Sequence, residues 1–393
     1  MDRGNGNPGA VIVGGSFHSL GAARNLAKHG VPVHILDSGA CVAQFSRSVK
    51  RFLKCPSVDD EAGFVRFLVQ HAAERNTEGW VLFPSNDEHV RILAQHRERL
   101  SEHYLVTTPP WDVVKFLYDK GLTHRLAQER GVPVPETYNP DTADDLVSLK
   151  LDFPVVLKPA ISKRFMSATR KKAYRANDMQ ELINLYGRMA GIIDPSEILI
   201  QELIPGRAEN LFSFVGFFKD GVPVAGLSAR RPRQHPMEFG RASTHVESVD
   251  LPELEMLATQ FLKGIAFSGL AEVEFMYDQK DARFELLEVN PRIWGWHTIA
   301  IHAGLDLPYL AYADAMGQEV AVGPLREGVK WVRLVTDIPT AIPEILSGRL
   351  AMRQYLASMS GDIGFAVLSL NDPLPFIADL FLGPYNYLKS GGF

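Results

Sequence analysis

The chain has 393 residues, 46% of them hydrophobic and 22% charged, and a formal net charge of −5. This length is too great for one ordinary core, so we expect two or three globular domains. The acidic balance offers no basic surface for nucleic acid, and no apolar run approaches the roughly 18 residues of a membrane-spanning helix. The first residues lack the apolar segment of a secretory signal, and Cys41 and Cys55 lack metal-ligand spacing. We therefore expect buried thiols in a reducing, cytoplasmic setting.

Alternating strands and helices predict a doubly wound α/β domain over residues 1–108. The expected strands are 10–15, 31–37, 80–85 and 103–108, and the expected helices are 17–29, 60–75 and 87–98. The turn GGSFHSLG and Asp37 are a weak match to the dinucleotide-binding pattern. Ligands of such sheets lie at the carboxyl ends of strands, where this chain has His18 and the run SNDE at 85–88. SNDE is also typical of a capped helix start, and the two roles can coexist.

A boundary at Pro109–Pro110 precedes a region that ends near residue 200. The expected elements are a helical hairpin, a strand at 153–159, a helix at 178–190 and a strand at 196–204. Lys158 ends an apolar strand, so its ammonium group either is solvated above a buried stem or contacts phosphate. The segment 160–178 contains six Lys and Arg residues. It predicts either a solvated surface or a loop that binds polyphosphate and could close as a lid.

The last part of the chain predicts a hairpin at 210–231 that turns at 219–221, and then a second basic, proline-broken loop at 230–240. Helices are expected at 252–265 and 305–316. Residues 320–393 predict a mixed extension, and its apolar tail at 373–388 should pack on the body rather than contact a membrane. The chain has no P-loop, no G-x-S-x-G nucleophile motif and no zinc-like histidine spacing.

The stretch FELLEVNPRIWGW, residues 284–296, carries the strongest chemical signal. As a strand it places Glu288, Asn290 and Arg292 on one face and Leu287 and Val289 on the other. Carboxylate and amide oxygens suit Mg²⁺, and a planar guanidinium suits phosphate or carboxylate. The alternative is a charged edge strand whose spacing is incidental.

A second strand, 269–278, is expected to pair with this stretch across a turn at 279–281. Antiparallel pairing would bring Glu274 beside Glu288. Two close carboxylates are unfavourable unless a cation lies between them, so the pairing favours a metal site. The alternative is that Glu274 points to solvent.

In this order, these segments resemble the ATP-grasp superfamily, above all its carboxylate–amine ligases of the D-aspartate ligase-like type, over about residues 10–320. The resemblance implies a combined α/β and α+β fold with a Rossmann-like pre-ATP-grasp domain at 1–108. Linker helices and the ATP-grasp N-lobe would occupy 109–200, and the C-lobe 201–320. A C-terminal extension packed on the body would occupy 321–393.

The resemblance also assigns roles to single residues, in the segments DKGLTHRLAQERGVPVPET, FPVVLKPA, EILIQELIPG, AEVEF and ELLEVNPR. It implies nucleotide contacts at Lys120, Lys158, Gln201, Glu202, Leu203 and Ile204, and a ribose contact at Glu209 or Asn210. It implies Mg²⁺ ligands, for two ions with Mn²⁺ as an alternative metal, at Glu274, Glu288 and Asn290. It implies contacts to the transferred phosphate or substrate at Arg292, Arg231 and Arg233. Two departures are the glycine-free segment 160–173 and Gln201, where many relatives have an acid.

The implied activity joins a carboxylate to an amine through an acyl phosphate and releases ADP and phosphate, on an amino-acid-like substrate. The alternatives are a biotin carboxylase-like carboxylase, a non-catalytic nucleotide-binding protein on this fold, and a Rossmann oxidoreductase. The expected partners are a small carboxylate and an amine, with no nucleic acid and no membrane, and a homodimer is allowed. Four residues could line the acceptor pocket or pack in the core: Trp294, Trp296, His297 and His302.

Overall fold

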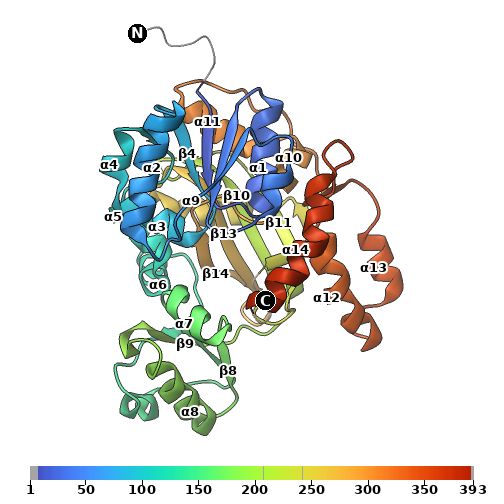
Figure 1. Cartoon of the computed structure of the whole chain (residues 1–393). Helices are drawn as coiled ribbons and strands as arrows, with labels where there is room; N and C mark the ends of the chain where they lie inside the picture. Colours follow the sequence, from blue (N-terminus) through green and yellow to red (C-terminus); the bar gives the residue numbers. More distant parts are fainter. Residues whose placement is uncertain (1–7, 207, 241, 391–393) are drawn as a thin grey trace.

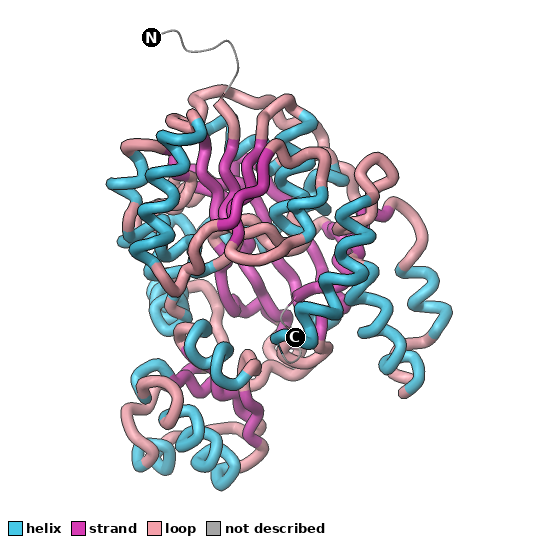
Figure 2. Tube along the Cα trace, viewed as in Figure 1, coloured by secondary structure: helices cyan, strands magenta, loops and turns pink. Residues whose placement is uncertain are grey.

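The computed structural model describes residues 8–206, 208–240 and 242–390. Its strands form three sheets that follow one another along the chain (Figure 1). The four-stranded sheet and its helices form a small lobe that projects from the body, as Figure 2 shows. No helix in the described ranges is long and apolar enough to cross a membrane.

The first sheet has five parallel strands in the order β3-β2-β1-β4-β5, which confirms the doubly wound prediction. The strands are β1 (Ala10–Val13), β2 (Val33–Asp37), β3 (Arg51–Lys54), β4 (Trp80–Pro84) and β5 (Tyr104–Val106). The helices are α1 (Phe17–Lys28), α2 (Glu61–Arg75), α3 (Asp87–Gln95) and α4 (Arg97–Ser101). Strand β3 was not predicted, because its four residues are exposed or half-buried and show no apolar run. Cys41 and Cys55 are buried free thiols, as expected.

The small lobe follows the helices α5 (Trp111–Tyr118) and α6 (Lys120–Glu129). Its strands, in the order β6-β9-β7-β8, are β6 (Thr137–Tyr138), β7 (Val155–Pro159), β8 (Tyr174–Ala176) and β9 (Ile198–Glu202). The prediction of a loop over 160–178 is wrong, since this segment contains α7 (Ser162–Thr169) and β8. Phe165 on α7 is fully buried and packs edge-on against Tyr174, so an apolar contact orders this basic segment. The last helix of the lobe is α8 (Met179–Ala190), and the domain boundary expected at 200/201 falls inside β9.

The large sheet has seven strands in the order β14-β13-β10-β11-β12-β15-β16. They are β10 (Leu211–Lys219), β11 (Val222–His235), β12 (Ala242–Val249), β13 (Gly269–Asp278), β14 (Arg283–Asn290), β15 (Lys330–Val332) and β16 (Ile363–Phe365). Its helices are α9 (Pro252–Lys263), α10 (Thr298–Ala303) and α11 (Leu307–Ala315). The prediction of a basic loop over 230–240 is wrong for the residues up to His235, because β11 continues to that residue and pairs with β12.

The C-terminal extension completes this large sheet instead of only packing on it. Its strands β15 and β16 form one edge of the sheet, and α12 (Leu334–Leu346), α13 (Met352–Ser358) and α14 (Leu374–Ser390) lie together beside it (Figure 1). One partly buried ion pair joins the extension to α1, and a second lies within the extension. Arg24 Nε lies 2.9 Å from Asp372 Oδ2, and Arg333 Nη2 lies 3.1 Å from Asp379 Oδ1.

Candidate active site

Two adjoining cavities lie on either side of the acidic end of β13 and β14. The first cavity, of about 220 Å³, lies between the small lobe and the large sheet. The second cavity, of about 510 Å³, lies between the N-terminal domain, α7 and the same two strands. The cavities share six lining residues: Lys120, Ser162, Lys172, Arg231, Glu274 and Glu288. A molecule in either cavity would therefore contact the same set of charges.

Strands β13 and β14 pair in the register that the sequence predicted. Glu274 lies opposite Glu288, and Glu272 lies opposite Asn290. The Asn290 amide nitrogen donates hydrogen bonds of 2.9 Å to Glu274 and 3.2 Å to Glu272. Glu272 was not predicted as a site residue, although it stands two residues before Glu274 and so had to share its face.

A β-bulge in β14 changes the face on which Leu287 lies. Phe275 pairs with Leu286 whereas Glu274 pairs with Glu288, so Leu287 is an extra residue without a partner on β13. Leu286 takes the core position and is fully buried, and Leu287 lines the first cavity beside Glu288. The expectation that Leu287 lies on the face opposite Glu288 is therefore wrong.

Cationic side chains surround the carboxylates at this wall. Arg231 forms ion pairs with Glu274 and, at 3.4 Å, with Glu272. The Nζ atoms of Lys120 and Lys172 lie 3.4 and 3.3 Å from the Glu288 carboxylate oxygens. Burial alone would raise the pKa of Glu288, but these lysines hold it well below its usual value.

Burial shifts the pKa values of Lys158 and Glu272 in this region. Burial, together with the nearby Lys120 ammonium, lowers the pKa of Lys158 to about 7. Burial and the neighbouring Glu274 carboxylate raise the pKa of Glu272 above its usual value. Additional charge in the cavities would thus alter the protonation of both groups.

The acidic set has the chemistry of a site for a hard divalent cation. Three carboxylates and one amide face the cavities from two paired strands, and oxygen ligands of this kind suit Mg²⁺. The positive charge beside them comes from Arg231, Lys120 and Lys172. Bound cations could take over the neutralisation of the carboxylates and leave the basic groups to pair with phosphate.

A second group of carboxylates lies at the other end of the same hairpin and lines neither cavity. Asp278, Asp281 and Glu285 approach one another there. Arg283 forms ion pairs with Glu285 at 2.6 Å and with Asp281 at 3.3 Å. Arg283 thus neutralises part of the charge of this cluster, which lies away from both cavities.

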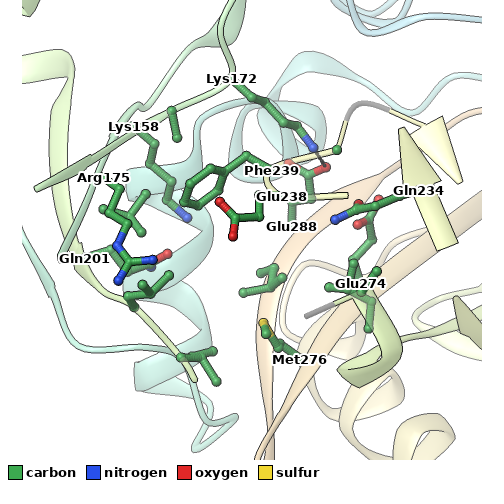
Figure 3. Close-up of a pocket in the computed structure, with 18 of the residues that line it drawn as sticks. Lys158, Lys172, Arg175, Gln201, Gln234, Glu238, Phe239, Glu274, Met276 and Glu288 are labelled. Carbon is green, nitrogen blue, oxygen red and sulfur yellow. Dashed lines mark hydrogen bonds and ion pairs between the residues drawn. The ribbon is translucent and has the colours of Figure 1, made fainter. Parts of the chain in front are cut away.

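The predicted hinge, residues 201–204, lines the first cavity. The Gln201 side chain donates to Thr137 Oγ1 at 2.8 Å, so its polar group is engaged within the protein. Glu209 does not line the cavity; it is exposed, and its carbonyl accepts a hydrogen bond from Arg230. Figure 3 shows a different acid, Glu238, pointing into the cavity beside Phe239.

Arg292 lines the second cavity, as expected, and it connects two domains. Its Nε lies 2.6 Å from Asp87 Oδ1 at the carboxyl end of β4, and its Nη2 donates to Asn290 Oδ1 at 3.0 Å. The Asn86 side chain caps α3 by accepting from His89 N at 2.8 Å. The run SNDE thus both caps a helix and contributes to the cavity.

Arg233 does not reach either cavity, unlike Arg231. Its guanidinium binds both oxygens of the buried Asp337 carboxylate, at 2.8 and 3.0 Å. In the pairing of β11 with β12, Arg230 lies opposite Glu247 and Arg233 lies opposite His245. Strand β11 therefore contains one extra residue between Arg230 and Arg233. This irregularity turns Arg233 toward the C-terminal extension, which corrects the expectation of a phosphate or substrate contact.

The aromatic residues after β14 divide between cavity and core. Trp296 lines the second cavity and donates from Nε1 to Glu272 at 2.9 Å. Trp294 and His297 are buried and line neither cavity, and His302 packs near Gly364 of β16. Of the four residues suggested for an acceptor pocket, the structure thus brings only Trp296 to the site.

Comparisons with known proteins find similar proteins for this chain. A family model described as "ATP-grasp in the biosynthetic pathway with Ter operon" matches residues 230–337. D-aspartate ligase from Enterococcus faecium (strain Aus0004) is 25% identical over 254 residues, which are 60% of this chain and 59% of that protein. The match therefore spans less than two thirds of that relative.

Solved structures share the fold. L-amino acid ligase from Bacillus licheniformis has a TM-score of 0.61 and 17% identity, over 79% of this chain and 75% of that one. Biotin carboxylase from Campylobacter jejuni has a TM-score of 0.63 and 15% identity, over 79% and 72%. The chain is thus similar to ATP-grasp proteins: the family model matches residues 230–337, and the fold is shared over most of the chain.

Proposed function

We propose that this protein is an ATP-dependent carboxylate–amine ligase that acts on amino-acid-like substrates and releases ADP and phosphate. The observation that carries the proposal is the charged wall shared by the two cavities. A nucleotide in the first cavity and an acid in the second would meet at that wall. The D-aspartate ligase relative supports ligation to an amine.

The first cavity would hold ATP. The main chain of the hinge lies at one end of it, and Lys158, Lys120 and Lys172 lie toward the shared wall, where the phosphates would be placed. Glu238 is better placed than Glu209 to contact the ribose hydroxyls. Phosphoryl transfer depends mainly on positioning and on neutralised charge, which this set of lysines supplies.

The metal site would consist of Glu274, Glu288 and Asn290, with Glu272 next to them. Bound Mg²⁺ would supply neutralisation of the phosphate charge and a fixed orientation of the phosphates. Without metal, Arg231, Lys120 and Lys172 pair with the carboxylates. On binding, the cations would pair with the carboxylates and the phosphates of ATP would pair with the three basic side chains. The net charge of the site would therefore change little.

The reaction would proceed in two steps in the second cavity. A substrate carboxylate oxygen attacks the γ-phosphorus, the bond from phosphorus to the ADP oxygen breaks, and an acyl phosphate forms. The amine nitrogen then attacks the acyl carbon, phosphate leaves with the bonding electrons, and the nitrogen loses a proton. Arg292 is placed to orient the carboxylate and then the acyl phosphate.

Helix α7 is placed to protect that intermediate from water. Lys163 on α7 forms ion pairs with Asp59 at 2.9 Å and with Glu88 at 3.3 Å, both in the N-terminal domain. These contacts hold the small lobe over the second cavity, whose wall includes Met166. Closure of this kind excludes water from a reactive acyl phosphate.

The test is a screen for phosphate release with ATP, Mg²⁺ and amino acids supplied singly and in pairs. We expect release to require one acid and to rise with an amine, and hydroxylamine to trap the acid as a hydroxamate. Glu288→Gln should abolish the signal, whereas the matched control Asp281→Asn, a charge removed from the same hairpin, should retain it. ADP formation that requires biotin and bicarbonate would instead indicate a carboxylase. ATP binding without turnover across the panels would indicate a nucleotide-binding protein.

A further inference from the structure

The imidazole of His18 lines the second cavity together with Arg292. His18 lies in the first turn of α1, directly after β1, and Asp87 follows the neighbouring parallel strand β4. The carboxyl ends of these two strands meet at one edge of the sheet, and Asp87 there binds the Arg292 guanidinium. His18 is therefore at the place where an amine would meet an acyl phosphate held by Arg292.

The ring nitrogen Nδ1 of His18 has no hydrogen-bond partner among the described residues, and it is enclosed by the protein. Buried polar atoms are nearly always paired, because an unpaired one costs free energy that a partner would recover. Bulk solvent does not reach Nδ1. The missing partner would therefore be an N–H or O–H group of a molecule bound in the cavity that the ring lines.

The ring is neutral and so is able to accept a proton. Burial, followed by the charge of Arg292, lowers the pKa of His18 well below its usual value. His297 and Arg333 act in the same direction, and a hydrogen bond to the Ser85 carbonyl opposes them. Because Nδ1 has no partner, Nε2 donates this bond and Nδ1 keeps the lone pair. A phosphate group in the cavity would favour the charged ring and so raise this pKa during the reaction.

The other titratable side chains of this cavity are engaged, within the part of the chain that the structure describes. The Tyr118 hydroxyl donates to Glu88. The lysines and arginines that line the cavity have no lone pair to offer. The acidic side chains are all in ion pairs with lysine or arginine: Asp87, Glu88, Glu272, Glu274 and Glu288. His18 is thus the neutral base of the cavity that no cation occupies.

We infer that His18 is the base that accepts a proton from the amine in the second step of the ligation, an assignment that rests on the proposed function. As the amine nitrogen bonds to the acyl carbon, it gives one proton to His18 Nδ1. A weak base is sufficient here, because the nitrogen becomes much more acidic once that bond forms. The bond from the acyl carbon to the phosphate oxygen then breaks, and phosphate leaves with the bonding electrons. His18 returns the proton to the phosphate, so the products are the amide and hydrogen phosphate.

The experiment compares two acceptors of the same acyl phosphate, namely the amine identified by the phosphate-release screen and hydroxylamine. Hydroxylamine is a weakly basic nucleophile whose adduct loses its proton readily, so it depends little on an enzyme base. His18→Gln should lower amide formation by about a hundredfold and leave hydroxamate formation within about threefold of the wild type. The first step transfers no proton, so ATP consumption that requires the acid should also be retained.

Chemical rescue and a matched control separate a catalytic role from a structural one. His18→Ala should show the same difference between the two products, and free imidazole added to this variant should restore part of its amide formation. His103→Gln is the control, because His103 lies in the same domain, pairs with Glu78 at 3.0 Å and lines neither cavity. It should form both products at wild-type rates, and thermal unfolding should show that every variant is folded.

Three results would overturn the assignment: an equal loss of amide and hydroxamate in His18→Gln, unchanged amide formation in that variant, or no effect of imidazole on His18→Ala. Wild-type protein that releases no phosphate with any acid would be a different result. It would refute the proposed function itself, and the assignment of His18 with it.

Discussion

The lowered pKa of Lys158 predicts a pH dependence for nucleotide binding. Burial and the nearby Lys120 reduce this pKa to about 7, so at neutral pH only about half of the molecules carry the ammonium charge. Phosphates placed beside Lys158 would favour its charged form and raise the pKa in the complex. Binding above pH 7 would therefore take up a proton, and affinity should fall as pH rises.

The size of the effect follows from the fraction of protein that is protonated before binding. That fraction falls from about one half at pH 7 to about one hundredth at pH 9, so the affinity should fall about fiftyfold, approaching tenfold per pH unit. The nucleotide itself contributes little in this range, because its last phosphate ionisation lies near pH 6. Below pH 7 the affinity should level off, since Lys158 is already charged.

The assay is calorimetric titration with ADP in the absence of metal, from pH 6.5 to 9, in buffers of different ionisation enthalpy. The heats should report uptake of nearly one proton at the alkaline end. Lys158→Arg, which keeps its charge at every pH, should bind with an affinity that is flat over the same range. A flat profile for the wild type, or the same slope in the arginine variant, would refute the assignment of Lys158 to the phosphates.

Three further predictions concern the charged wall and its supports. Arg292→Lys should lower turnover by about ten- to a hundredfold in a phosphate-release assay, because a lysine cannot bind two oxygens at once or hold Asp87 in the same way. Arg233→Met should lower the free energy of unfolding by about 3–5 kcal/mol in urea, since it leaves the Asp337 carboxylate buried without its partner. ADP affinity of that variant should be unchanged, and a loss of binding would contradict our placement of Arg233. Lys163→Met should raise the ratio of phosphate to amide product, because a looser α7 admits water; an unchanged ratio would exclude α7 as the barrier.

The strand pairing of the acidic hairpin was predictable because alternation and turn length fix which residues lie opposite each other. Glu274 and Glu288 meet as expected for that reason. Leu287 was assigned to the wrong face and Arg233 to the wrong partner, because each lies at or beside a single extra residue in its strand. A bulge reverses the faces on which the following residues of a strand lie, and the hydrophobic pattern of the sequence does not reveal it. Lys172 could be recognised only in part, since its pairing with Glu288 depends on how the small lobe sits on the large sheet.

The bulge in β11 also explains how the extension is joined to the body that forms the cavities. Without the extra residue, Arg231 and Arg233 would face the same side. With the extra residue, Arg231 binds Glu274 in the cavity wall and Arg233 binds Asp337 in α12. Two side chains of one strand therefore contact the site and the extension, respectively. The strand cannot shift at one side without breaking a buried ion pair at the other. Strands β15 and β16 continue the same sheet, so the extension supports the cavity wall.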